Sequence, residues 1–212
     1  FKNLLQSFST FQDLLYDTIE NEPYTAMRYL ETSRGEIRRG KVMLDSLLDF
    51  VHDSEVTVPC IDMGSSIQEI LNHIQTTIPS GMKLIPQILD TGSVRFAPQD
   101  LYRVIQNLIN NAVQASEGFG DIYIILRRVH PGANEQNPVW MELSVRDEGK
   151  GMDPSELKMV FQPFYTTRKV QGGLGLGLSG VMGLVSASGG FVDVDSNPGE
   201  GSVFRIMLPL CN

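Results

Sequence analysis

The sequence predicts an α+β protein in which an N-terminal helical hairpin precedes a mixed α/β domain. The residues from Phe1 to Phe50 contain one proline and two glycines, and they carry apolar side chains at helical spacing. From about Val56 onward, strand-like runs rich in β-branched residues alternate with helical patterns. A glycine-rich stretch then leads into a late apolar helix. We therefore expect domains at residues 1–54 and 55–212.

The hairpin is predicted from two amphipathic stripes that are separated by a break at residues 21–23, Asn-Glu-Pro. One hairpin buries only one face, so two copies forming a four-helix bundle would complete its core. Docking of the hairpin on its own α/β domain is the alternative. The apolar positions are Phe1, Leu4, Leu5, Phe8, Phe11, Leu15 and Ile19 in the first stripe, and Met27, Leu30, Ile37, Leu44, Leu47, Leu48 and Val51 in the second.

Elements of the α/β domain follow from their local patterns. Proline near residue 98 marks a helix start. The polar run 130–138 reads as a loop between paired strands, and 197–201 as the turn of a closing hairpin. We predict strands at 56–61, 83–89, 94–97, 121–129, 139–146, 191–195 and 202–208, and helices at 65–78, 98–116, 154–161 and 176–187.

Composition excludes several classes of protein. The 212 residues include 25 acidic and 17 basic side chains, a net charge of −8, which argues against a nucleic-acid partner. We find no apolar run of about 18 residues and no signal-peptide pattern. We therefore expect a cytoplasmic fragment without direct membrane contact, although a longer parent protein could be anchored. Cys60 and Cys211 lack paired spacing and are interpreted as free thiols in a reducing compartment.

Asp147 ends an apolar strand and is followed by Gly149 and Gly151. A partly buried carboxylate at this position can accept a hydrogen bond from the exocyclic amine of adenine. The glycines let the backbone pass close to the base. A plain strand-to-turn segment is the alternative interpretation.

Asn107 and Asn111 lie one helical turn apart on one face of the helix predicted at 98–116. Carboxamide oxygens are hard ligands that suit magnesium, which bridges phosphates. Asparagine is a mediocre helix former, so Asn107, Asn110 and Asn111 within an apolar helix favour a functional role. Polar residues on a helix surface are the alternative.

Glycines at 172, 173, 175 and 177 lead directly into the last predicted helix. Backbone amides at a helix start bind anions such as phosphates. Residues 175–180 also match the G-x-G-x-x-G string of dinucleotide-binding folds. However, that motif follows an apolar strand, whereas 165–171 is polar and too little chain remains for a doubly wound sheet.

Residues 161–168, Phe-Gln-Pro-Phe-Tyr-Thr-Thr-Arg, lie between the acid and the glycines. Aromatic side chains can anchor a mobile lid, and Thr, Arg and Lys can reach phosphate. An irregular surface loop is the alternative. In this order and at these separations, the motifs predict one pocket for a purine triphosphate and hence an ATP-using enzyme.

The chain resembles the catalytic core of a two-component sensor histidine kinase, with the ATP-binding α/β sandwich of the GHKL superfamily and its mixed sheet. The family's boxes match 107–115, 147–151, 161–167 and 173–177, and 199–204 resembles the last box. The resemblance implies ATP and Mg²⁺, with Asn111 as the metal ligand. Where the family often has lysine, this chain has Gln114, so Arg168 or Lys169 would supply positive charge. The implied cofactor-binding residues are Asn107, Asn111, Gln114, Asp147, Gly149, Gly151, Met152, Phe161, Thr166, Thr167, Lys169, Gly173, Leu174, Gly175, Leu176, Gly177, Leu178 and Ser202.

The hairpin resembles the family's dimerisation and phosphotransfer helices, which implies a homodimer and a response-regulator partner. Asn3 would follow one turn after an acceptor histidine that lies just before residue 1, and an amide there implies a phosphatase role. His52, His73 and His130 do not fit the acceptor position. Two alternatives stay open: an adaptor that keeps the fold without kinase activity, and another GHKL ATPase such as an anti-sigma serine kinase.

Overall fold

A computed structural model of the 212-residue chain divides it into two compact units. The first comprises Phe1–His52 with Arg168–Leu174, and the second comprises Asp53–Thr167 with Gly175–Asn212. The predicted domain boundary between residues 54 and 55 stays a prediction. The structure describes residues 9–10, 13–14, 22–48, 58–130, 139–168 and 175–211.

The first unit contains helix α2, which spans Pro23–Leu48. Proline at its first position needs no N–H partner there, so the helix begins at the predicted break. Residues 9–10 and 13–14 are also helical. The remaining residues of the first predicted helix lie outside the described residues, and the four-helix bundle stays a prediction.

The second unit is built on a five-stranded mixed sheet with the strand order β2-β4-β5-β7-β6. The β2–β4 pair is parallel, and the other three pairs are antiparallel. Strands β1 and β3 form a separate antiparallel pair. The strands are β1 (Cys60–Asp62), β2 (Met82–Ile88), β3 (Ser93–Arg95), β4 (Gly120–Val129), β5 (Trp140–Asp147), β6 (Phe191–Asn197) and β7 (Gly201–Pro209).

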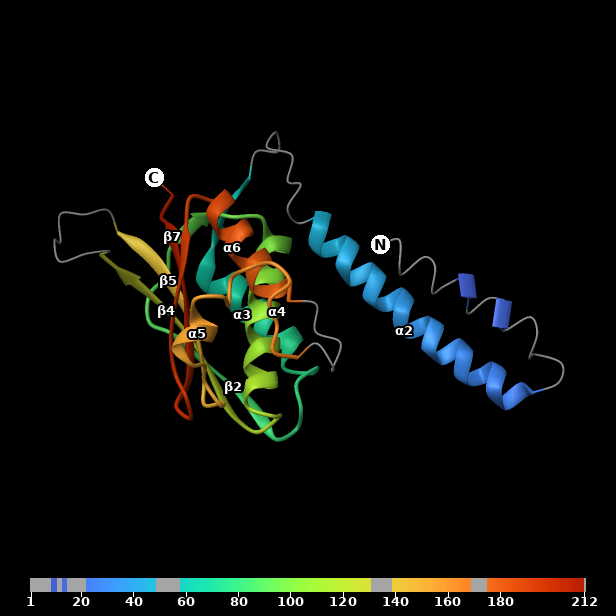
Figure 1. Cartoon of the computed structure of the whole chain (residues 1–212). Coiled ribbons are helices and arrows are strands. Elements are labelled where there is room, and N and C mark those ends of the chain that lie inside the picture. The colour runs from blue at the N-terminus through green and yellow to red at the C-terminus, as the bar shows by residue number, and fades with distance from the viewer. Residues whose placement is uncertain are drawn as a thin grey trace. The chain divides into compact units, whose positions relative to one another are not determined.

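Helices α3, α4 and α6 lie on one face of this sheet and bury the core against it (Figure 1). The side chain of Asp62 caps α3 by accepting from the Ser65 N–H at 2.8 Å. Pro98 opens α4 as predicted. The helices are α3 (Met63–Ile74), α4 (Pro98–Ala115), α5 (Pro154–Leu157) and α6 (Gly177–Ala187).

The first predicted strand and the helix predicted at 154–161 differ from the structure. Of the strand predicted at 56–61, residues 56–57 lie outside the described residues, 58–59 are not in a strand, and the pair that β1 forms with β3 is three residues long. The helix predicted at 154–161 ends at Leu157. Beyond it the Gln162 N–H donates to the Met159 carbonyl at 2.8 Å, an i to i−3 bond that tightens the chain into turns.

The prediction of two free thiols is wrong: Cys60 and Cys211 form a disulfide, with Cα atoms 6.4 Å apart. The residues are separated by 151 positions, so local spacing cannot reveal the pair. They meet because β1 and the segment after β7 both lie next to β3: β1 pairs with β3, and Leu210 forms a bridge to Val94.

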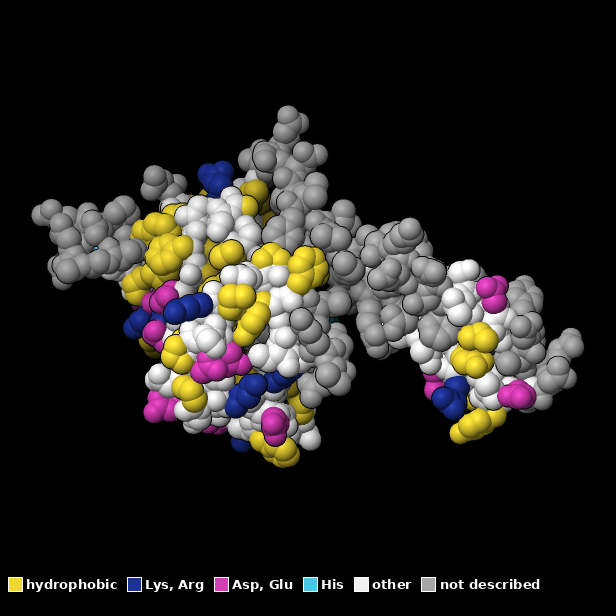
Figure 2. Space-filling view, in the orientation of Figure 1, with side chains coloured by type: hydrophobic (Ala, Val, Ile, Leu, Met, Phe, Trp, Pro, Cys, Tyr) yellow, Lys and Arg dark blue, Asp and Glu magenta, His cyan; other side chains and the backbone are white. Residues whose placement is uncertain are grey.

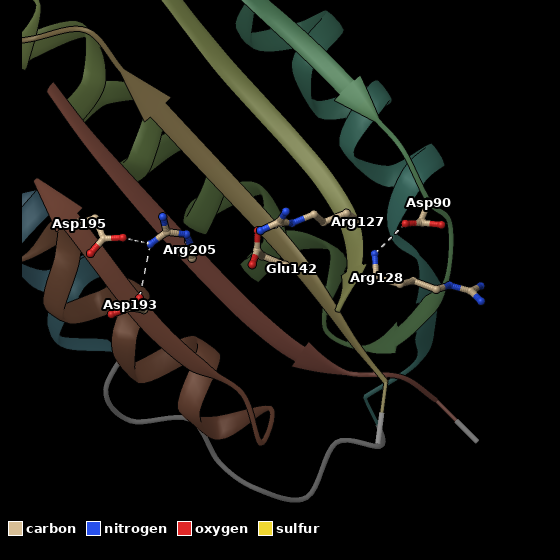
Figure 3. Close-up of polar contacts among 7 residues, drawn as sticks. All are labelled: Asp90, Arg127, Arg128, Glu142, Asp193, Asp195 and Arg205. Carbon is tan, nitrogen blue, oxygen red and sulfur yellow. Dashed lines mark hydrogen bonds and ion pairs between the residues drawn. The ribbon is translucent and has the colours of Figure 1, made fainter. Parts of the chain in front are cut away.

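Charged side chains occupy the sheet face opposite the helices (Figure 3). Arg127 on β4 contacts its register partner Glu142 on β5 at 2.8 Å. Arg205 on β7 contacts Asp195 at 2.6 Å and Asp193 at 3.5 Å, both on β6. On the face seen in Figure 2, basic and acidic side chains of the second unit lie interspersed. Within the described ranges, no helix has the length and apolarity that a membrane span requires.

Candidate nucleotide-binding site

Helix α4 presents a row of side chains that links the two ends of the predicted site. Asn107, Asn111 and Ala115 are spaced four residues apart and therefore share one helix face. At one end, a Cβ on Gly177 would come within 3.3 Å of the Asn107 Oδ1. At the other end, the Lys150 N–H donates to the Ala115 carbonyl at 3.1 Å. The row is about 12 Å long, with Asn111 at its middle.

Asp147 is the last residue of β5, and it is 2% exposed. Its Oδ1 accepts a hydrogen bond from the Gly149 N–H at 2.9 Å. Burial raises the pKa of the Asp147 carboxyl above its ordinary value, and the backbone N–H groups of Gly149 and Ser202 act in the opposite direction. A further donor from a ligand would stabilise this buried carboxylate.

The loop after Asp147 is held between α4 and the β6–β7 turn. A Cβ on Gly149 would meet the Ala115 carbonyl carbon at 2.6 Å, so only glycine fits this approach. Gly151 has a φ of +65° and lies against the Asn197 backbone. The Gly199 N–H donates to the Lys150 carbonyl at 2.7 Å. These contacts fix the backbone on both sides of the buried acid.

A serine pair supports the same loop from the sheet. Ser196 and Ser202 are register partners on β6 and β7, and their Oγ atoms lie 3.0 Å apart. The Ser196 hydroxyl donates to the Gly201 carbonyl at 2.8 Å and accepts from the Met152 N–H at 2.9 Å. Ser202 was predicted from the sequence, whereas Ser196 was missed. The hairpin turn at 197–201 places Ser196 opposite Ser202, and this pairing is the sequence signal that could have identified Ser196.

The half-buried Asn111 has an amide nitrogen that is buried and, among the residues that the structure describes, lacks a hydrogen-bond partner. A buried amide without a partner is costly unless something else satisfies it. The neighbouring Asn110 is exposed. Within the asparagine cluster, Asn111 is therefore the residue whose buried amide donor a bound ligand could satisfy.

Helix α6 begins at Gly177, next to Asn107. Its N-cap is Leu176, and no described side chain caps it by a hydrogen bond. Leu176 is buried, and the half-buried Leu178 packs against the core, which fixes the first turn. The first backbone N–H groups of a helix lack intrahelical acceptors and attract anions. The α6 terminus therefore offers amide donors near Asn107.

The segment that joins the two halves of the site is closed at its base. The Phe164 N–H donates to the Gly175 carbonyl at 2.8 Å, and Gly175 has a φ of +67°. Phe161 packs edge-on against Phe204 in the core, with ring centroids 6.4 Å apart. Phe164 and Gly175, which flank this segment, are therefore neighbours in the fold.

Several predicted site residues are not brought into this row. Gln114 and Thr167 are exposed, Thr166 is half-buried, and Arg168 is grouped with the first unit. The remaining four predicted residues lie outside the described residues: Asn3, Lys169, Gly173 and Leu174.

The fold and this row define an ATP-binding α/β domain with helices on one face of a mixed sheet. Residues 97–212 match the family described as histidine kinase-, DNA gyrase B- and HSP90-like ATPase. The match covers more than half of the chain, so the chain belongs to this family. Together with the relatives below, it is a catalytic ATP-binding core of the histidine kinase type.

Among curated relatives, the sensor histidine kinase ZraS of Klebsiella oxytoca is 29% identical over 170 residues, covering 79% of this chain and 35% of the relative. The sensor kinase CckA of Brucella abortus is 34% identical over 144 residues, which is 64% of this chain and 14% of CckA. The chain thus spans about a third or less of these relatives.

Among solved structures, the mycobacterial sensor histidine kinase MprB has a TM-score of 0.60 and 26% identity, covering 72% of this chain and 97% of MprB. A structure of full-length ShkA in complex with AMPPNP has a TM-score of 0.69 at 20% identity. It covers 100% of this chain and 46% of ShkA, and at this identity it shows the fold alone.

Proposed function

We propose that the chain is the core of a sensor histidine kinase that binds Mg-ATP and transfers its γ-phosphoryl group to a histidine. The observation that carries this proposal is the α4 row, in which Asn111 lies between the buried Asp147 loop and the start of α6. Its length of about 12 Å suits an extended nucleotide with the base at one end and the phosphates at the other.

The adenine is recognised by Asp147. The exocyclic amine donates to the carboxylate, and the Gly149 N–H holds the carboxylate in place. Gly149 and Gly151 fix the loop that follows the acid, since a Cβ on either would collide with neighbouring backbone. Met152, held by Ser196, covers one side of this position.

The phosphates lie at the other end, at the α6 terminus. Wherever the chain is described, no group of three or more His, Cys, Asp or Glu residues gathers to hold a metal. A magnesium ion here would therefore be shared between the Asn111 amide oxygen and the phosphates, which is how magnesium is usually held with nucleotides. Bound magnesium neutralises phosphate charge. The Asn111 Nδ2 gains a partner from the same ligand.

The lid expected from the sequence at about Thr166 to Gly173, with positive charge from Arg168 or Lys169, stays part of the proposal, and residues 169–173 lie outside the described residues. Catalysis of phosphoryl transfer is mostly positioning and charge neutralisation. The acceptor histidine lies on the helical hairpin, upstream of Phe1, and an aspartate of a response regulator receives the phosphoryl group next. Asn3 positions water when the regulator is dephosphorylated.

The chain acts as a homodimer through its helical hairpin. Met27, Leu30 and Ile37 of α2 are 64%, 44% and 50% exposed in one copy. Their spacing places them on one helix face, and an exposed apolar face of this kind marks an interaction surface. A second copy of the hairpin would cover it.

Radiolabel transfer from γ-labelled ATP tests the proposal, using the chain extended toward its N terminus. We expect an acid-labile, alkali-stable phosphohistidine, and Asp147→Asn should strongly reduce its formation at limiting ATP. Nucleotide binding without phosphohistidine would instead favour the adaptor. Phosphorylation of a serine in a partner protein would favour an anti-sigma type of kinase.

A further inference from the structure

The Cys60–Cys211 disulfide lies in the second unit, away from the α4 row. Cys60 is the first residue of β1 and is exposed, whereas Cys211 follows Leu210 and is half-buried. The Cys60 end of the disulfide therefore lies at an exposed residue on the surface of the second unit. Neither cysteine is among the residues proposed to bind the nucleotide.

Backbone contacts hold the two cysteines near β3 independently of the bond between their sulfurs. Cys60 is the register partner of Arg95. On the segment after β7, the Cys211 N–H donates to the Ser93 carbonyl at 2.8 Å. Leu210 is packed so closely that a Cβ on Gly92 would come within 2.6 Å of its Cδ2. The reduced thiols therefore stay neighbours, and the bond can open and close without refolding.

We propose that Cys60 and Cys211 form a reversible thiol–disulfide site that is oxidised by peroxide and, when oxidised, stabilises the fold of the second unit. The inference rests on the proposed function in one respect: an ATP-using kinase works where thiols are kept reduced. In such compartments disulfides are usually transient and redox-sensing. In a compartment where thiols are kept reduced, a disulfide at an exposed residue is a regulatory site and not a permanent structural bond.

The chemistry balances with hydrogen peroxide as the oxidant. The Cys60 thiol ionises, its thiolate attacks one peroxide oxygen, the O–O bond breaks, and Cys60 sulfenic acid forms while the leaving hydroxide takes up the released proton to become water. The Cys211 thiolate then attacks the Cys60 sulfur, forming the S–S bond and expelling a second water after protonation. The two sulfurs lose two electrons in total. Two reduced glutathione molecules reverse the step and leave as glutathione disulfide.

Oxidation ties β1 to the segment after β7 and closes a loop of 151 residues. Such a loop restricts the unfolded chain strongly, so we expect the oxidised unit to melt about 10 °C higher than the reduced one. Ser202 lies at the opposite end of β7 from the Cys211 segment, about 30 Å along the strand direction. Nucleotide affinity should therefore be the same in both states.

The experiment treats the whole chain with hydrogen peroxide, then with reduced glutathione, and traps free thiols by alkylation for mass spectrometry. We expect an intramolecular disulfide after peroxide and two free thiols after glutathione, with melting temperatures that follow the bond. Cys211→Ser should abolish the temperature difference. The double variant Cys60→Ser/Cys211→Ser should melt like the reduced protein, which shows that serine is tolerated.

The proposal is overturned by a disulfide that stays closed in excess reduced glutathione, by thiols that never pair, by links between chains, or by equal melting temperatures. A fluorescent ATP analogue is titrated into both states in parallel. Loss of its binding in both states would count against the proposed function and leave the thiol result standing. A difference in nucleotide affinity between the oxidised and reduced proteins would contradict the expectation that the disulfide leaves the nucleotide site unchanged.

Discussion

Gly177 lies against Asn107, so that a Cβ on the glycine would come within 3.3 Å of the Asn107 Oδ1. This approach joins the start of α6 to the middle of α4. It places the free amides of one helix beside the asparagine face of another. Two long helices are thereby tied at the position where the phosphates are proposed to bind.

Substitution of Gly177 by alanine should displace Asn107 and weaken nucleotide binding about tenfold, a loss of about 1.4 kcal/mol. Gly180 provides the matched control, because it lies in the same helix and a Cβ there meets nothing within 4 Å. Gly180→Ala should raise the free energy of unfolding by about 1 kcal/mol and leave affinity unchanged. Calorimetric titration and thermal melts measure both. Equal nucleotide affinities for Gly177→Ala and Gly180→Ala would contradict a role of the Gly177–Asn107 contact in nucleotide binding.

Asp147 should make the unliganded protein less stable at neutral pH than its Asp147→Asn variant. Burial raises the folded-state pKa of this carboxyl, so its ionised form costs stability above that pKa. The cost is relieved as the pH falls through the raised value toward the ordinary one near 3.8. The difference in melting temperature between the two proteins should therefore narrow on acidification. A difference that is independent of pH would show that the carboxyl does not titrate as proposed.

The Arg127–Glu142 pair should matter more for stability than the Arg205 pairs (Figure 3). Glu142 is 7% exposed in its side chain, so Arg127→Met leaves a buried carboxylate without its partner. Since the Arg127 side chain is 49% exposed, solvent screens part of the loss, and we expect about 1–2 kcal/mol. The partners of Arg205 are exposed, so Arg205→Met should cost about 0.5 kcal/mol or less. Urea unfolding distinguishes these values, and a larger loss for Arg205→Met would refute the ranking.

The exposed face of α2 should control self-association. Leu30→Glu places a charge within the proposed helix interface and should weaken the dimer at least about tenfold. Thr32→Glu is the control, because Thr32 is exposed on the opposite side of the same helix. Light scattering coupled to gel filtration at several concentrations measures the effect. Equal self-association of the two variants would show that this face of α2 does not form the dimer interface.

Local patterns predicted most elements because their causes are local. Pro98 and the apolar period predicted α4 at 98–116, and the structure has Pro98–Ala115. The hairpin turn at 197–201 likewise predicted the strand at 202–208, and β7 is longer by a residue at each end. Boundaries failed where the chain turns through i to i−3 bonds, as at Gln162.

Tertiary relationships were not predictable in the same way. The Cys60–Cys211 bond depends on β3 lying between two segments that are far apart in sequence. Ser196 supports Met152 across 44 positions, and its own neighbours give no sign of this role. Asp147 and the asparagines were found because their residue types are unusual in an apolar strand and helix. Their geometry, however, required the structure.

Titration of a fluorescent ATP analogue with magnesium into the wild-type chain, Asp147→Asn and Asn111→Ala tests the central claim most directly. We predict saturable binding of a single nucleotide to the wild type. Asp147→Asn should weaken it about 10- to 100-fold through the lost charge-assisted hydrogen bond, and Asn111→Ala should remove its dependence on magnesium. Wild-type protein that ignores the analogue, or variants that bind it as the wild type does, would contradict the account.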